Sequence, residues 1–160
     1  MSNVLIGIIG VILFIGLALA GALFLGPRFQ ESTNNSRASA AVQAVSQVSN
    51  AANMYNVQEG KIPSAIDDAT HTATTLIGGG YLKSVPANPT TGGAVVLDST
   101  NKVVTMTLGG NASSICKAIN KQTAGLADTA PYPTAAVGTA GCYADKADNT
   151  AATFTAFASV

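Results

Sequence analysis

The chain opens with a long apolar run that contains no charged residue. The run extends from Val4 to Leu25, which is 22 residues. At about 1.5 Å per residue, an α-helix of this length spans roughly 33 Å, enough to cross the hydrocarbon of a bilayer. No basic residue precedes Val4 and no small-x-small cleavage site follows Leu25, which argues against a cleaved signal peptide. We therefore expect a membrane-inserted helical stalk.

Small residues recur within this apolar run. Glycine stands at positions 7, 10, 16, 21 and 26, and the pairs Gly16/Ala20 and Ala18/Ala22 have four-residue spacing. Small residues at this spacing let two helices approach closely. Glycine also costs up to about 1 kcal/mol relative to alanine inside a helix. The pattern therefore favours a helix packed against other helices over a lone anchor.

A break in the helix is predicted where Gly26 precedes Pro27. Proline has no amide hydrogen, and its ring clashes with the carbonyl four residues back, at Leu23. From Ser36 the helical pattern resumes, and its apolar residues lie three or four positions apart, at Ala38, Ala41, Val45, Val48, Ala52 and Tyr55. This stripe is typical of a helix that packs on a sheet. A coiled-coil seam is the weaker alternative because the stripe is short and lacks flanking charges.

The remainder of the chain indicates a small α+β head. The segments 94–97 and 103–108 surround a polar turn and predict a hairpin. Asn111 is a candidate side-chain cap for a short helix over 112–120, and 153–160 is expected to be a closing strand. We therefore predict residues 1–35 as the stalk and residues 36–160 as the head. The fold class is a long N-terminal α-helix, broken near Pro27, packed on a small antiparallel sheet with one disulfide.

Charge and cysteine usage narrow the setting. The 160 residues contain eight basic and eight acidic side chains, so no electrostatic footprint for nucleic acid or acidic lipid is present. An even pair of cysteines, Cys116 and Cys142, is interpreted most simply as one disulfide in an oxidising compartment. We expect that bridge to hold the C-terminal strand and the loop 131–133 onto the sheet. Arg28 and Arg37 follow the span, and the positive-inside rule would place that side of the membrane in the cytoplasm. The cysteine pair indicates the opposite side. A basic leader, already removed, would reconcile the two indications.

Candidate chemical motifs are few. The glycines at 78–80 lack the Lys-Ser/Thr of a phosphate loop and indicate a flexible turn. His71 has no Cys, His or carboxylate pattern around it and is interpreted as a solvated loop residue. No nucleophile and base stand at a recognisable spacing. We expect no enzymatic activity, no cofactor and no metal.

Taken together, these features resemble the type IV pilins, and the type IVb class in particular. The resemblance covers the whole chain as an architecture. It rests on the apolar N-terminal helix, the helical half and turn over 36–63, Asn88-Pro89 with Gly92-Gly93 ahead of a hairpin, and Cys116-Lys117-Ala118-Ile119 paired with a late cysteine. One position departs from the family, which usually carries a glutamate at the fifth mature residue where this chain has Leu5.

The resemblance implies a subunit of an extracellular pilus filament that serves adhesion, aggregation, motility or uptake. Met1 would be the processed N-terminus. The partners implied are copies of the same chain and an inner-membrane assembly machinery, with transient insertion in that membrane before assembly. The residues expected to carry polymerisation are Val4, Leu5, Ile8, Val11, Gly16, Ala20 and Gly21.

Two alternatives stay open. A type II secretion pseudopilin shares the stalk and the sheet and often binds calcium near its C-terminus. Asp145, Asp148 and Asn149 are candidate ligands, although they lack the spacing of a known calcium loop. The other alternative is a membrane-anchored periplasmic protein.

Overall fold

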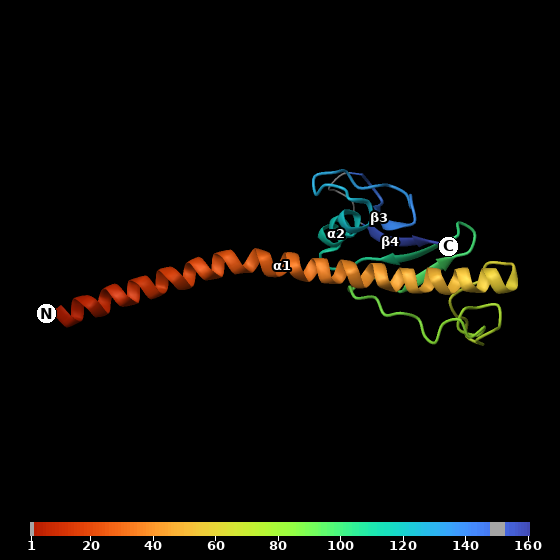
Figure 1. The fold of residues 1–160 in the computed structure, drawn as a ribbon, viewed down its shortest axis with the longest axis horizontal. Coiled ribbons are helices and arrows are strands. Elements are labelled where there is room, and N and C mark those ends of the chain that lie inside the picture. The colour runs from red at the N-terminus through yellow and green to blue at the C-terminus, as the bar shows by residue number, and fades with distance from the viewer. Residues whose placement is uncertain (1, 148–152) are drawn as a thin grey trace. The chain divides into compact units, whose positions relative to one another are not determined.

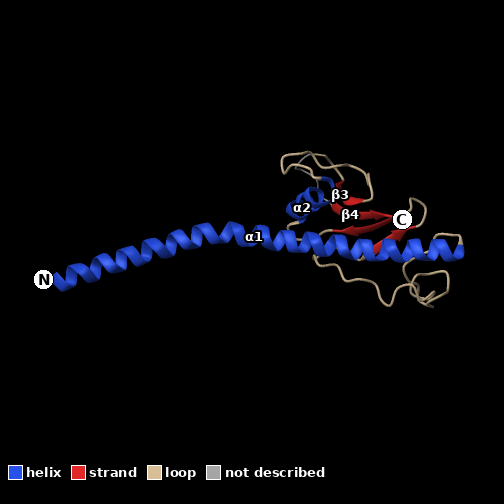
Figure 2. Ribbon diagram, viewed as in Figure 1, coloured by secondary structure: helices blue, strands red, loops and turns tan. Residues whose placement is uncertain are grey.

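The computed structural model describes residues 2–147 and 153–160, with the side chains of residues 2, 3, 24 and 25 left aside (Figure 1). The chain divides into two compact units, Met1–Thr33 and Asn34–Val160. The second unit contains the sheet and the disulfide. The layout is therefore α+β, with a long apolar N-terminal helix and a small antiparallel sheet (Figure 2).

The first helix, α1, spans Ser2–Glu59 and contains Pro27 in its interior. The predicted break at Gly26-Pro27 is therefore wrong for the single chain. A proline removes one backbone hydrogen bond, and local contacts support the turn that follows it. Arg28 lies 3.9 Å from Glu31, and the Thr33 hydroxyl donates to the Phe29 carbonyl at 2.9 Å. The helix therefore continues through Pro27 and lacks the one backbone hydrogen bond that proline cannot donate.

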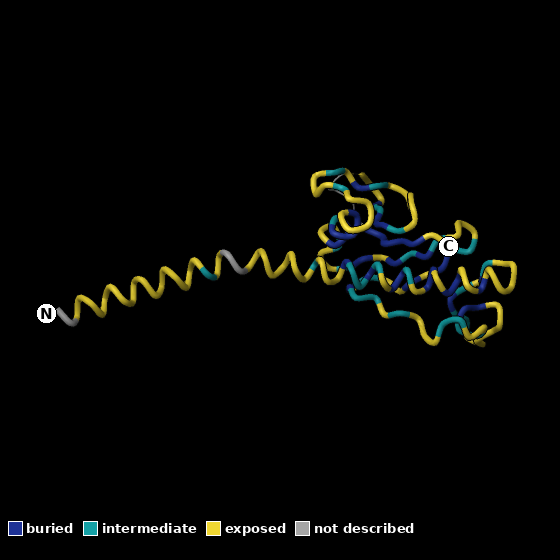
Figure 3. The backbone as a smooth tube through the Cα atoms, viewed as in Figure 1, coloured by how far each residue is buried: buried dark blue, intermediate teal, exposed yellow. Residues whose placement is uncertain are grey.

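The second half of α1 is the central core element of the head. Every residue of the predicted stripe, from Ala38 to Tyr55, is at most 1% exposed, so the prediction that this face packs in the head is confirmed (Figure 3). The helix ends at Glu59, and Gly60 follows it. That glycine adopts a left-handed φ of 68°, and its amide donates to the Asn56 carbonyl at 2.9 Å, which caps the last turn.

Four antiparallel strands form the sheet, in the order β1-β2-β4-β3. They are β1 (Val95–Asp98), β2 (Val103–Thr107), β3 (Ala140–Ala144) and β4 (Phe154–Ser159). The predicted hairpin is confirmed as β1 and β2, in which Asp98 pairs with Val103, and the predicted closing strand is β4. Strand β3 was not anticipated, since its sequence Ala-Gly-Cys-Tyr-Ala has few β-branched residues.

One face of the sheet contributes to the buried core of the head. Cross-strand partners share a face, so the pairs Val104/Ala158 and Met106/Ala156 lie on one side. These four residues belong to the same buried cluster as the α1 stripe. The Ser49 hydroxyl of α1 also donates to the Ser159 carbonyl at 2.5 Å. The buried cluster and this hydrogen bond therefore join α1 to one face of the sheet.

A second helix, α2, spans Ala112–Ala124. Asn111 occupies its N-cap position, but the predicted side-chain cap is wrong, because the side chain makes no capping hydrogen bond. Its backbone, at φ −78° and ψ 49°, lies outside the extended region in which a cap side chain reaches the following amides. The Asn111 carbonyl instead accepts from the Ile115 amide at 3.0 Å. Gly125, with a left-handed φ of 65°, ends the helix.

The segment before β1 is tied to the end of β2. The Asn88 side-chain amide donates to the carbonyls of Gly93 and Thr107 at 2.6 and 2.9 Å. A Cβ added to Gly92 would lie 1.9 Å from the Thr107 carbonyl oxygen. Only glycine permits this approach of two backbones, which explains the first of the two glycines ahead of the hairpin.

Candidate functional site

The apolar half of α1, over Val4–Leu23, presents large hydrophobic side chains to its surroundings. Each of them is at least half exposed. They are Val4, Leu5, Ile6, Ile8, Ile9, Val11, Ile12, Leu13, Phe14, Ile15, Leu17, Leu19 and Leu23. Consecutive positions differ by about 100° around a helix, so these residues cover its whole circumference. A helix that is apolar all round is stable only when lipid or protein encloses it.

The residues predicted to carry polymerisation lie on this surface. Val4, Leu5, Ile8 and Val11 are 56–69% exposed. Ala20 is exposed and Gly21 is partly exposed. Leu5 stands where the pilin family has a glutamate, so this position of the apolar surface is uncharged. Met1, the predicted processed N-terminus, lies outside the described residues. The apolar surface therefore makes no ion pair of its own along Val4–Leu23.

The glycines of this half have no packing role inside the chain. A Cβ added at Gly7, Gly10, Gly16, Gly21 or Gly26 would meet no atom within 4 Å. Each glycine nevertheless lowers helix stability relative to alanine. No contact within the described chain therefore requires glycine at these positions.

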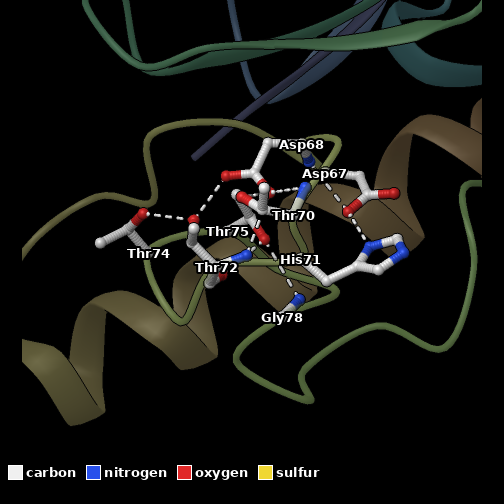
Figure 4. Close-up of polar contacts among 8 residues, drawn as sticks. All are labelled: Asp67, Asp68, Thr70, His71, Thr72, Thr74, Thr75 and Gly78. Atoms are coloured by element: carbon white, nitrogen blue, oxygen red, sulfur yellow. Dashed lines mark hydrogen bonds and ion pairs between the residues drawn. The ribbon is translucent and has the colours of Figure 1, made fainter.

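A polar loop in the head surrounds Asp68 (Figure 4). One carboxylate oxygen accepts from the backbone amides of Thr70 and Thr72, both at 3.0 Å. The other accepts from the Thr72 hydroxyl at 2.5 Å. Because hydrogen bonds to a carboxylate favour its ionised form, the Thr72 hydroxyl, followed by the Thr72 amide, lowers the pKa of Asp68 to about 2.

His71 lies beside this loop and is not the isolated residue that the sequence suggested. Its Nδ1 is 2.6 Å from a carboxylate oxygen of Asp67, four residues earlier. The imidazole remains 65% exposed and has a left-handed φ of 48°. The interpretation of His71 as an exposed loop residue is confirmed, whereas its contact with Asp67 was not anticipated. The pair closes a surface loop.

The glycines at 78–80 form a packed turn. A Cβ at Gly78 would lie 2.0 Å from the Thr72 carbonyl oxygen. The Gly78 amide donates to the Thr75 hydroxyl at 3.1 Å, and the Gly79 amide donates to the Thr75 carbonyl at 3.0 Å. Glycine is thus required at 78 by the approach of the Asp68 loop and not by flexibility.

The predicted disulfide between Cys116 and Cys142 is present, with Cα atoms 5.4 Å apart. It joins α2 to β3, and both cysteines are fully buried. The expectation that the bridge anchors the last strand directly is therefore corrected, because β4 is held by its strand neighbours on both sides. What the bridge anchors is β3, the edge strand that no sequence signal predicted.

Asn120 completes the attachment of β3. Its side-chain amide donates to the Cys142 carbonyl at 2.9 Å, and its carbonyl accepts from the Cys142 amide at 2.8 Å. Farther along β3, the Ala144 amide donates to the Pro133 carbonyl at 2.8 Å. These contacts occupy backbone groups of an edge strand that would otherwise attract another chain. Sequence reasoning missed Asn120, whose position four residues after Cys116 on the same helix was the available signal.

The loop 131–133 is held by aromatic packing in addition to this backbone bond. The Tyr132 ring packs edge-on against Phe154 of β4, with centroids 4.9 Å apart. The Lys117 ammonium lies 5.6 Å from the centroid of the same ring. A proline-rich loop has few backbone donors, so these side-chain contacts supply its attachment.

The calcium candidates are not brought into a site. Asp145 accepts from the Thr153 amide at 3.2 Å, and Asp148 and Asn149 lie outside the described residues. Over residues 2–147 and 153–160, no group of three His, Cys, Asp or Glu side chains is placed to hold a metal ion.

No protein-family model, curated protein or solved structure matches this chain.

The Asp68 loop generates a pH prediction. A folded-state pKa below the ordinary value of 3.8 means that the loop bonds add stability above pH 3.8, and that this stability is lost as pH falls toward 2. We expect the carboxyl carbon resonance of Asp68 to titrate with a midpoint near 2. Replacing Thr72 with valine removes a donor and should move that midpoint toward 3.8. Identical midpoints in the two proteins would contradict the role assigned to the Thr72 hydroxyl.

The disulfide generates a stability prediction. By the chain-entropy model, closing a loop of 26-residue separation contributes about 3.5 kcal/mol, against a typical domain stability of about 5–15 kcal/mol. Cys116→Ser should therefore lower the free energy of unfolding of the head by up to this amount, measured by urea denaturation.

The matched control for that measurement is Cys142→Ser, which removes the same bond from the other side and should give the same loss. Intact-mass measurement with an alkylating reagent, without reduction, should find no reactive thiol in the native chain. Two alkylated thiols in fresh material would overturn the prediction.

Proposed function

We propose that the chain is the structural subunit of an extracellular filament of the type IV pilus kind, which polymerises through the apolar half of α1. The observation that carries this proposal is the all-round exposure of large apolar side chains over Val4–Leu23. This surface has the length and hydropathy of a membrane span. Such a helix needs an apolar enclosure that its own chain does not supply.

The helix would have two enclosures in succession. Before assembly, the bilayer surrounds the helix, since its backbone bonds are satisfied internally. On assembly, the same half of α1 from neighbouring subunits replaces the lipid. Burial of apolar side chains contributes roughly 25 cal/mol per Å², so a filament core built from such helices offers an environment comparable to the membrane.

The glycines favour the second enclosure over a permanent anchor. A single-pass anchor needs hydrophobicity alone, and leucine or alanine would supply it without the helix penalty of glycine. Gly16 and Gly21 leave open space on the helix surface, and contact between helices in apolar surroundings depends on such small residues. The pattern is suited to close contact with other copies.

Charge has a secondary part in the proposed assembly. With Leu5 in place of the family's glutamate, subunits cannot align by pairing that carboxylate with a neighbour's N-terminal amine, so alignment depends on helix packing. Residues 34–160 carry seven basic and seven acidic side chains. A head without net charge limits electrostatic repulsion between heads held side by side.

The disulfide and the implied partners complete the proposal. A bridge between buried cysteines is suited to an oxidising, extracytoplasmic compartment. The resemblance to type IV pilins supplies the machinery, an inner-membrane assembly complex that extracts the subunit, and the range of roles, from adhesion and aggregation to motility and uptake. No catalytic step is assigned to the chain.

A first test separates the two units. A fragment beginning at Asn34 keeps the whole buried stripe from Ala38 to Tyr55 and lacks the apolar surface. We expect it to be a soluble, disulfide-bonded monomer, as measured by light scattering and intact mass. Filaments formed by this fragment would show that the heads alone drive assembly and would contradict the proposal.

A second test targets the small-residue surface. Gly16→Leu meets nothing within its own chain and raises both helix propensity and hydropathy, so membrane insertion should be retained. Bulk at a close contact should nevertheless reduce the assembled fraction by roughly tenfold, which corresponds to about 1.4 kcal/mol per contact. The measurement compares sheared filament with membrane-bound subunit in cells that carry the assembly machinery.

The matched control is Gly16→Ala, which gives a similar gain in helix propensity with little added bulk. We expect it to assemble far better than the leucine variant. Equal assembly of the native chain, the alanine variant and the leucine variant would show that no close helix contact forms at position 16.

A further inference from the structure

The outer face of the sheet, which points away from the buried α1 stripe, contains a hollow of about 540 Å³. It lies within the range of about 300–1,000 Å³ usual for small-molecule sites. The turn 98–102 between β1 and β2 lines it, as do residues 135, 136 and 138 of the loop before β3. All of these residues belong to the head, so the hollow is formed by the single chain.

Aromatic rings and a glycine shape this hollow. Phe157 of β4 and Tyr143 of β3 both line it, with ring centroids 5.9 Å apart. Gly141 lies opposite Phe157 in the sheet register, and a Cβ there would approach the Phe157 ring to 3.1 Å. Glycine at 141 therefore leaves room for the Phe157 ring across β3.

Lys102 is the unexpected residue of the lining. It has a left-handed φ of 56° at the last position of the hairpin turn, where glycine or asparagine is favoured. A lysine there costs backbone energy that glycine would avoid, which points to a use for its side chain. Over residues 2–147 and 153–160, its ammonium has no ion-pair partner within 4 Å.

The acid in the lining, Asp98, is already engaged. One of its oxygens accepts from the amides of Thr100 and Asn101, both at 3.0 Å. Its other oxygen accepts from the Asn101 side chain at 2.7 Å. Its acceptors are therefore directed into the turn and not toward Lys102. The lining thus contains one cation without a carboxylate partner, which suits it to a ligand that carries a carboxylate.

The remaining lining residues narrow the ligand further. Six of the eleven lining residues have polar side chains, namely Asp98, Asn101, Lys102, Thr105, Tyr143 and Ser159. Such a lining favours a ligand with several hydroxyl groups over a purely apolar one. The partly exposed Tyr143 ring, which packs against the buried Phe157 ring, offers a surface for the C–H face of a sugar ring. We propose that this hollow binds an acidic saccharide, with Lys102 recognising its carboxylate.

The test measures binding to the full chain in detergent micelles by amide chemical-shift titration. Glucuronate is the probe, and glucose and acetate at matched ionic strength are the comparison ligands. We expect saturable shifts at residues 102–105 and 135–138 with glucuronate, and binding at least about tenfold weaker with glucose and with acetate, because each lacks one half of the recognised chemistry.

Lys102→Gly separates binding from structure. It removes the charge and suits the left-handed backbone, so the thermal midpoint should stay equal or rise while glucuronate binding falls by roughly tenfold. Lys83→Gln, which removes a cation elsewhere on the head, should leave binding unchanged. A lower thermal midpoint in Lys102→Gly would assign Lys102 a structural role and count against the proposal.

Three further results would overturn the proposal. They are the absence of saturable shifts with glucuronate, glucose binding as tightly as glucuronate, and undiminished binding to Lys102→Gly. Acetate binding as tightly as glucuronate would reduce the hollow to a simple anion site and would likewise exclude the saccharide.

Discussion

An apolar helix surface that the chain itself does not cover is the constraint on which the rest of the structure depends. Over Val4–Leu23, side chains of valine, isoleucine, leucine and phenylalanine cover the full circumference of α1. Water is a poor environment for such a surface. In the proposed function, the molecule lies first in lipid and then exchanges lipid for copies of itself. Glycines that serve no contact inside the chain favour exchange.

The head is built to be independent of that exchange. It takes the second half of α1 as its core helix and buries the alanine and valine stripe against strands that also contain alanine. Its weakest element is β3, a short edge strand of small residues. That strand is held by the disulfide to α2, by the Asn120 side chain and by the Pro133 carbonyl. A stable head is what an exposed filament surface would require.

Features encoded by periodicity and local punctuation were predictable from the sequence. This class comprises the buried stripe, the hairpin, the closing strand and the cysteine pair. Features decided by long-range contacts were not predictable. Strand β3 has residues with little strand preference of their own, and it is held by its pairing with β4 and by Asn120 and Cys116 on α2. The Asp67–His71 pair was missed because its four-residue spacing falls in a loop.

Pro27 shows the opposite error, in which a local rule was given too much weight. Helix α1 continues through this residue with the loss of only one hydrogen bond of a long ladder.

For the candidate assembly surface, the sequence predicted which residues are apolar, whereas their exposure and the open space at each glycine required the structure.

The central claim is that neighbouring copies enclose the apolar half of α1. Cryo-electron microscopy of filaments sheared from cells tests it most directly. We predict a uniform filament of this one chain, with residues 4–25 of adjacent subunits in mutual contact along the axis and the heads outside. Cells that carry the assembly machinery but keep the chain as a membrane-embedded monomer, or a filament whose axis contains no α1 helices, would contradict it.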